Sequence, residues 1–181
     1  MVDPSDRVYF RLLVIRCQAG DHVAFEELVA RCHRGLRGFL HKMLANQHNV
    51  DDVVQDVWIE VFRSLKSLND PDAFRAWLYR AARNRAYWLL RKQRVSISSI
   101  DEIDPVAADK EPEFSAADAQ ALHGALGQLG PEHREVLLLR FMEDLSYEEI
   151  SAVVGCHVGT VRSRIHNAKQ QLRIIIQKQT G

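Results

Sequence analysis

The 181-residue sequence contains only three cysteines, and no two of them form a Cys-x-x-Cys arrangement. Widely separated thiols in odd number predict neither a disulfide framework nor a thiolate zinc site. Cys32-His33 and Cys156-His157 are adjacent pairs, but no further ligand pair lies at metal-binding spacing. We therefore expect no metal and no cofactor, and the sequence leaves open whether Cys17, Cys32 or Cys156 has a redox role.

Long apolar runs are also lacking. The longest, such as residues 136–139 and 174–176, are far shorter than the roughly 20 residues that a helix needs to cross a bilayer. The first six residues are polar and acidic, and they lack the basic start, apolar stretch and cleavage site of a signal peptide. These absences predict a cytoplasmic protein with no membrane insertion.

Charge of one sign is not in excess, because 24 basic residues balance 24 acidic ones. The distribution is nevertheless uneven: residues 63–94 are strongly basic, residues 95–118 are strongly acidic, and residues 157–181 carry basic residues and no acid. A neutral total can therefore conceal two phosphate-binding surfaces separated by an acidic spacer.

Helical spacing recurs along the sequence, whereas strand-like alternation does not persist anywhere. An apolar stripe that runs from Val50 to Leu65 and includes Phe62 predicts one amphipathic helix with this stripe on its buried side. Gly20-Asp21 predicts a helix stop followed by an N-cap. We expect an all-α fold of two small helical domains, at 1–94 and 119–181, joined by a flexible acidic linker at 95–118. Helices are expected at 6–18, 21–44, 72–93, 116–129, 131–142, 147–154 and 158–176.

The region from Leu145 to Lys169 has the pattern of a helix-turn-helix. Ser146 and Glu149 predict a capping box, Gly155 supplies the turn, and a basic second helix follows. Burial of the apolar positions would leave a polar face that can meet base edges in the major groove. This face carries Arg162, Ser163, His166, Asn167 and Lys169. An ordinary basic, solvated helix face is the alternative.

The helix expected at 72–93 carries a second basic stripe with aromatic and amide side chains in it. Cations beside aromatic rings suit single-stranded nucleic acid, because charge holds the backbone while rings stack on exposed bases. The stripe comprises Arg80, Arg83, Asn84, Tyr87, Trp88 and Arg91. Taken alone, such a stripe is more often an ordinary solvated helix face.

The helix at 50–65 has an acidic and amide face that repels DNA and suits a basic protein partner. This face comprises Asp52, Gln55, Asp56 and Glu60. A solvated helix face is again the alternative.

Three segments together resemble bacterial RNA polymerase sigma factors of the extracytoplasmic-function group. Residues 51–58 resemble the "D-x-x-Q-[DE]-x-[FW]" helix of sigma region two, and residues 74–84 resemble that region's "F-x-x-W-L-Y-x-I-A-x-N" segment. Residues 146–150 with 158–164 resemble the signature of region four. The three motifs stand in the family's order, and the resemblance covers roughly residues 10–173.

The resemblance implies a protein without catalytic residues that directs core RNA polymerase to promoter DNA. The acidic helix face would bind the clamp helices of the polymerase's largest subunit, and region four would sit on the polymerase flap. Lys66, Ser67 and Asn69 would join the basic stripe in opening the minus-ten element, with Asn84 in the pocket for a flipped base. Thr160 and Arg173 would join the second basic face in reading the minus-thirty-five element. The linker would thread the active-site channel, and an anti-sigma factor would hold the protein inactive.

Two other functions are open to such a sequence. A stand-alone helix-turn-helix regulator would use its N-terminal half for dimerisation or sensing. An enzyme with a His/Cys site is a further alternative, but the sequence has no nucleophile–base or metal spacing for it.

Overall fold

Every regular element in the described part of the chain is a helix. The computed structural model describes residues 4–44, 50–96, 122 and 124–180, and over these ranges it confirms the all-α fold. The predicted linker lies outside the described residues beyond residue 96, and its first two residues belong to the helix before it. Half of the helix predicted at 116–129 is also outside the described residues, and residues 124–128 are helical as predicted. None of the described helices is long and apolar enough to cross a membrane.

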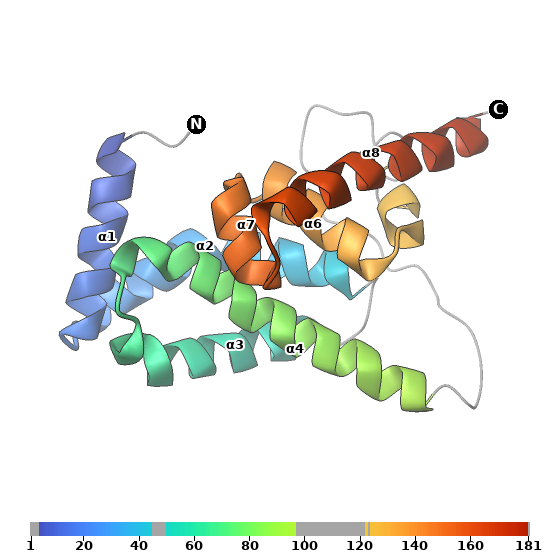
Figure 1. The fold of residues 1–181 in the computed structure, drawn as a ribbon. Helices are drawn as coiled ribbons and strands as arrows, with labels where there is room; N and C mark the ends of the chain where they lie inside the picture. Colours follow the sequence, from blue (N-terminus) through green and yellow to red (C-terminus); the bar gives the residue numbers. More distant parts are fainter. Residues whose placement is uncertain (1–3, 45–49, 97–121, 123, 181) are drawn as a thin grey trace.

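The helices form two bundles (Figure 1). The first bundle comprises α1 (Pro4–Gln18), α2 (His22–Met43), α3 (Val50–Ser64) and α4 (Phe74–Ser96), with short 3₁₀ turns at Leu65–Ser67 and Pro71–Ala73. The second bundle comprises α6 (Pro131–Phe141), α7 (Tyr147–Val154) and α8 (Val158–Thr180).

The boundary between α1 and α2 is set by the two residues that the sequence singles out. Gly20 has a φ of +92°, which favours glycine because it has no Cβ. The Asp21 carboxylate accepts the Ala24 N–H at 3.0 Å, so it caps one of the free amides at the start of α2. The predicted stop and N-cap are therefore confirmed.

The apolar stripe of α3 is buried against α2 and α4, with one exception. Val50, Val53, Val57 and Val61 are each at most 5% exposed. Phe62 is 53% exposed, contrary to its place in the predicted stripe. Its ring packs against the Phe25 ring in a T-shaped arrangement, with the two ring centres 5.1 Å apart, and the rest of the side chain remains in solvent.

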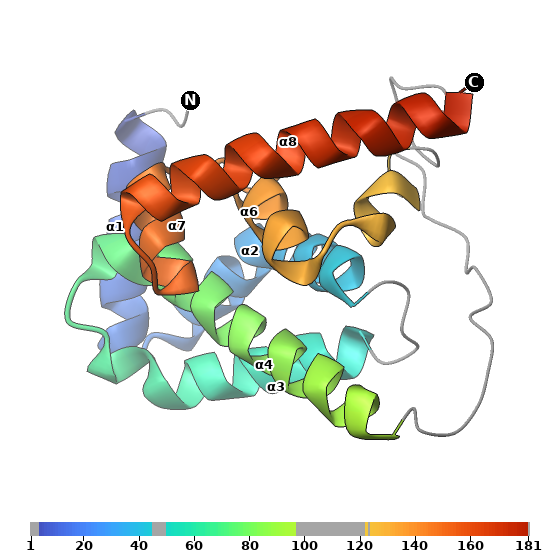
Figure 2. The ribbon, with the colours of Figure 1, turned by 45° about the vertical axis from the view of Figure 1, so that its right-hand side comes forward.

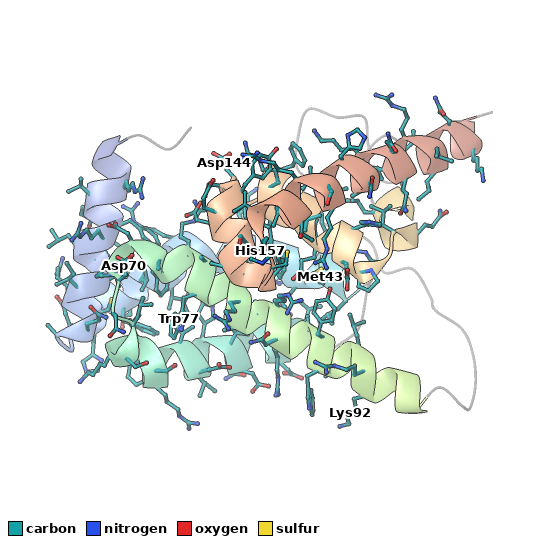
Figure 3. All side chains as sticks on the ribbon, in the orientation of Figure 1. Met43, Asp70, Trp77, Lys92, Asp144 and His157 are labelled. Carbon is teal, nitrogen blue, oxygen red and sulfur yellow. The ribbon has the colours of Figure 1, made fainter. Side chains whose placement is uncertain are left out.

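The helix predicted from residue 72 begins two residues later, because Pro71–Ala73 forms a 3₁₀ turn before α4. Asp70 caps this turn by accepting the Asp72 N–H at 3.0 Å. Figure 3 shows Asp70 at this end of α4 and Lys92 near its other end, with Trp77 between α4 and α3. Trp77 is half-buried and packs against the apolar core.

The predicted helix-turn-helix is formed by α7 and α8. Ser146 accepts the Glu149 N–H at 3.1 Å, and the Glu149 carboxylate accepts the Ser146 N–H at 2.7 Å, so the capping box is complete. Gly155 ends α7 with a φ of +72°. Val161 and Ile165 are buried against the α7 core, as their spacing predicts.

The two bundles pack directly against each other. Their buried apolar side chains belong to one contiguous core, and α7 contacts α4 while α6 contacts α2. Figure 2 shows α8 along the outer side of the second bundle, with α6 and α7 between it and the first bundle. This contact places the second bundle over one side of α4, where part of the basic stripe lies.

Replacing the cap residue tests how strongly local geometry stabilises the helix-turn-helix. Ser146→Ala removes the acceptor for the Glu149 amide and should lower the free energy of unfolding by about 1 kcal/mol. Glu149→Gln is the matched control, because glutamine can complete the same box. Urea denaturation followed by circular dichroism measures both changes, and an equal loss in the two variants would contradict the role of the cap.

Candidate nucleic-acid interface

The outer face of α8 carries the predicted base-reading residues. Val161, Ile165 and Ala168 face inward and are buried, which turns the opposite side of the helix to solvent. The side chains of Arg162, Ser163, His166, Asn167, Lys169 and Arg173 are exposed, and Thr160 is half-buried. The Ser151 hydroxyl donates to the Cys156 carbonyl at 2.5 Å and so holds the turn that orients this face.

Aromatic rings lie beside several cations of this surface. The guanidinium carbons of Arg140 and Arg162 lie 5.5 and 5.7 Å from the centre of the Tyr147 ring. The Lys169 ammonium lies 4.6 Å from the centre of the Phe141 ring. Cation–π contacts at these distances restrict the cations without neutralising them. The surface therefore offers positive charge in a defined arrangement.

Two further side chains on this face are held by their own helix. The Ser163 hydroxyl donates to the Thr160 carbonyl at 2.9 Å, which leaves its oxygen free to accept. Gln170 Nε2 lies 2.9 Å from His166 Nε2. These local contacts fix the rotamers while leaving the outer edges of both side chains in solvent.

The predicted basic stripe on α4 is divided by the contact between the bundles. Arg80, Asn84, Trp88 and Arg91 are exposed, whereas Arg83 and Tyr87 are partly covered. The Trp88 ring is 47% exposed, with the Arg85 guanidinium carbon 4.8 Å and the Lys92 ammonium 5.3 Å from its centre. An exposed ring between two cations suits base stacking with contacts to the backbone phosphates.

Arg83 and Tyr87 meet a buried carboxylate of the second bundle. Arg83 Nε lies 2.5 Å from Glu135 Oε1, and the Tyr87 hydroxyl donates to Glu135 Oε2 at 3.1 Å. The Glu135 side chain is fully buried, and burial raises the pKa of its carboxyl although Arg83 opposes the shift. Burial also raises the pKa of Tyr87, so its hydroxyl remains a donor to Glu135.

A second carboxylate enters the first bundle beside a glycine. The Tyr79 hydroxyl donates to Glu143 Oε2, and Arg75 donates to the Glu143 carbonyl. A Cβ atom on Gly35 of α2 would lie 2.7 Å from the same Oε2 and 2.8 Å from the Tyr79 hydroxyl. The absence of a side chain at Gly35 therefore makes room for the Glu143 carboxylate. Burial raises the pKa of this carboxyl, against the hydrogen bond from Tyr79.

Arg134 forms the third polar contact between the bundles. Its guanidinium donates to the carbonyls of Lys42 and Met43 at 3.3 and 3.1 Å, at the end of α2. It also donates to carbonyls of residues 126, 127 and 129. One buried cation thus satisfies carbonyls at the C-terminus of α2 that have no partner within the helix.

The loop between α3 and α4 is held in place by α1. The Gln18 amide donates to the carbonyls of Leu65 and Leu68 at 3.0 and 2.7 Å, and the Arg11 guanidinium lies 3.2 Å from Asp72. The predicted loop residues are Lys66, Ser67 and Asn69, and all three side chains are exposed. The loop therefore presents them from a fixed backbone at the start of α4.

The acidic face of α3 is exposed as predicted, although one of its members has an internal partner. Asp52, Gln55, Asp56 and Glu60 all lie on the solvent side of the helix. Asp56 pairs with Arg85 of α4. An exposed pair of this kind contributes little to stability, so Asp56 can exchange partners at low cost.

The three cysteines are free thiols and form no disulfide. Within the ranges that the structure describes, no cluster of three or more His, Cys, Asp or Glu side chains could hold a metal ion. Burial raises the pKa of Cys17 to about 11 and that of Cys32 to about 12. Both thiols are therefore protonated near neutral pH, which makes them poor nucleophiles.

The sequence alone did not identify the residues that join the bundles: Gly35, Tyr79, Arg134, Glu135 and Glu143. A signal was present for two of them. Gly35 lies inside a predicted helix, where glycine is unfavourable, and Glu135 directly precedes an apolar run. A glycine inside a helix indicates a close approach by another part of the chain, and a carboxylate beside an apolar run indicates a buried charge. The sequence does not show which distant residue is the partner in either case.

Solved structures share this arrangement of helices. CnrH, in complex with the cytosolic domain of CnrY, aligns with a TM-score of 0.73 and 29% identity, covering 93% of this chain and 97% of CnrH. The sigma factor RpoE of Bartonella quintana, in complex with the anti-sigma factor NepR, aligns with a TM-score of 0.74. That alignment covers 84% of this chain and 96% of RpoE, and its 24% identity supports the fold alone.

Sequence comparisons identify the family. Residues 28–95 match the family model of Sigma-70 region 2, and residues 119–172 match that of Sigma-70, region 4. The ECF sigma factor SigE of Mycolicibacterium smegmatis is 38% identical over 147 residues, which span 78% of this chain but 57% of that protein. The ECF sigma-E factor of Escherichia coli K12 is 35% identical, covering 93% of this chain and 94% of its own length. The chain therefore belongs to the ECF group of RNA polymerase sigma factors.

Proposed function

We propose that this sigma factor directs core RNA polymerase to promoters through three separate surfaces. The acidic face of α3 binds the clamp helices of the largest polymerase subunit. The α3–α4 loop and α4 capture the opened minus-ten element, and the outer face of α8 reads the minus-thirty-five element while its bundle sits on the flap. The observation that carries this proposal is the presence of exposed cationic faces on both α4 and α8, one in each sigma region.

The matches to region 2 and region 4 disfavour a stand-alone regulator, because they assign the N-terminal half to a sigma region rather than to dimerisation or sensing. The protein acts in the cytoplasm, where the polymerase is. It has no catalytic residues of its own, and the polymerase supplies the phosphoryl-transfer chemistry. The linker, which the sequence predicted at 95–118 and which follows α4 after residue 96, would pass through the polymerase active-site channel.

An anti-sigma factor is the proposed inhibitory partner. CnrH, which aligns over nearly the whole chain, is in complex with the cytosolic domain of CnrY, and RpoE is in complex with the anti-sigma factor NepR. Covering the polymerase-binding faces of α3 and of the second bundle would block assembly with core polymerase.

Charge reversal on α3 tests the polymerase contact. The double variant Asp52→Lys with Asp56→Lys should lose affinity for core polymerase and run-off transcription, because attraction across the interface becomes repulsion. Both side chains are exposed, so native circular dichroism should persist.

Arg85→Ala is the control, since it removes the internal partner of Asp56 while leaving the acidic face intact. It should retain core-polymerase affinity, as measured by titration with labelled protein. Unchanged affinity in the double variant would refute the assignment of this face.

The exposed amide of Asn84 tests the minus-ten surface. Asn84→Ala should slow promoter opening more than initial binding, because an amide offers a donor and an acceptor to a flipped base. The loss should be on the order of 1–3 kcal/mol, comparable to one good base contact. Permanganate footprinting measures opening, and a template with a preformed mismatched bubble should recover most of the lost rate. Unchanged permanganate reactivity would contradict this role.

Two variants of α8 separate base reading from phosphate binding. Asn167→Arg should shift the preferred minus-thirty-five sequence toward guanine at one position, since asparagine pairs best with adenine and arginine with guanine. Lys169→Ala should weaken all sequences about equally and reduce the salt dependence by roughly one contact. Selection of randomised minus-thirty-five elements by holoenzyme measures both. A changed preference in Lys169→Ala with none in Asn167→Arg would reverse the proposed orientation of α8.

A further inference from the structure

We propose that the outer face of α1 is a docking surface for an amphipathic helix of a partner protein, one whose apolar row is flanked by acidic side chains. This face lies on a different helix from the acidic face of α3 and the cationic faces of α4 and α8. Helix α1 stands at one end of the molecule, at the opposite end from the C-terminus of α8 (Figure 1). The proposal does not depend on the proposed function.

Helix α1 is apolar on two opposite sides. Leu13 and Val14 are buried in the core of the first bundle. A second row, Val8, Leu12 and Ile15, is 68%, 51% and 43% exposed. Because an α-helix has 3.6 residues per turn, this row points nearly opposite to the buried side. A helix that is apolar on all sides is normally covered on all sides, so the row indicates a contact with another molecule.

The exposed row has the spacing of a coiled-coil seam. Val8, Leu12 and Ile15 are separated by steps of four and three residues, and the exposed Ala19 follows directly after the end of α1. Alternating steps of this kind place side chains along one line of a helix, where they can pack into the face of a second helix. The occupant that fits this row is therefore an amphipathic helix.

Arginines border the row on both sides. Arg11 lies on one side and Arg16 on the other, and residues 7–20 include no Asp or Glu. Nη1 of Arg11 lies 3.2 Å from Asp72, and Nη2 of Arg16 lies 2.7 Å from Asp21. These pairs use one N–H donor of Arg11 and two of Arg16, whereas a guanidinium has five. Both cations are thus held beside the row with donors left for the carboxylates of a partner.

A second copy of this chain is a poorer occupant. In a parallel pair of α1 helices Arg11 would face Arg16 of the second copy, because the flanking e and g positions of a coiled coil oppose each other. In an antiparallel pair the arginines would lie near Gln18 and Tyr9, and neither side chain supplies a carboxylate. Flanking charges set the choice of partner, so the row selects a helix with Glu or Asp at these positions.

An anionic membrane surface also attracts basic amphipathic helices. Such helices bury a broad apolar face that carries Trp, Phe or Leu. The row on α1 is one residue wide and includes no aromatic side chain, and the opposite side of the helix is occupied by the core. The row therefore matches the seam of a second helix better than it matches a bilayer.

A pair of synthetic peptides tests the proposal. Each has about three heptads with leucine at a and d, and the e and g positions carry glutamate in one peptide and lysine in the other. Like charges keep either peptide from pairing with itself. Fluorescence anisotropy of the labelled peptides measures their binding to the full chain. The glutamate peptide should bind saturably but weakly, because so short a row buries less area than a stable interface requires. The lysine peptide should bind at least roughly tenfold more weakly.

The double variant Leu12→Gln with Ile15→Gln tests the row itself. Both side chains are exposed, so circular dichroism should remain native. Affinity for the glutamate peptide should fall at least roughly tenfold, because the apolar contact is lost. Val23→Gln is the matched control, since Val23 is 69% exposed on α2 and lies outside the row. Its affinity for the peptide should equal that of the wild type.

Equal binding of the two peptides would overturn the selection by charge. Absence of binding to the wild type, or unchanged binding to the double variant, would overturn the docking surface. Sedimentation equilibrium and cosedimentation with phosphatidylglycerol vesicles test the other two occupants. A dimer, or vesicle binding, that the wild type shows and the double variant loses would overturn the proposal in favour of a second copy or of a membrane.

Discussion

A fully buried carboxylate, Glu135, is the constraint on which the arrangement of the two bundles depends. Moving an ionised carboxyl out of water costs several kcal/mol, and a buried charge left without its partner is strongly destabilising. Arg83 and Tyr87 supply that partner from the first bundle. The buried carboxylate and its partners therefore fix how the two bundles meet.

The same contact links fold to function, because α4 serves two surfaces. One side of the helix packs its apolar residues on α3, as the repeating Phe74, Leu78 and Ala82 require. The other side carries cations, which keep their hydration when exposed to solvent and attract anions. Where the second bundle covers part of that side, its carboxylates replace the missing solvent. Exposed Trp88 and Asn84 remain outside this cover.

Helix α8 shows how a local device can present a polar face without such a trade-off. The capping box and Gly155 set the angle between α7 and α8, and burial of Val161 and Ile165 sets the rotation of α8. Its polar face then points away from the core whatever the position of the other bundle. The exposure of the α8 face is thus set within one small unit, whereas the exposure of the basic stripe on α4 depends on how the two bundles meet.

The sequence by itself determined the helices, their caps and their apolar faces. It predicted the Asp21 cap, the Ser146–Glu149 box and the exposed faces of α3 and α8, because these depend on residues within a few turns of one another. It predicted wrongly that Phe62 would be buried, since a stripe does not show where the bundle ends. Only the tertiary structure decided that Arg83 and Tyr87 meet Glu135 and that Gly35 makes room for Glu143. Those partners are separated by about fifty or more residues, and helical periodicity carries no information about which distant face will cover a given side chain.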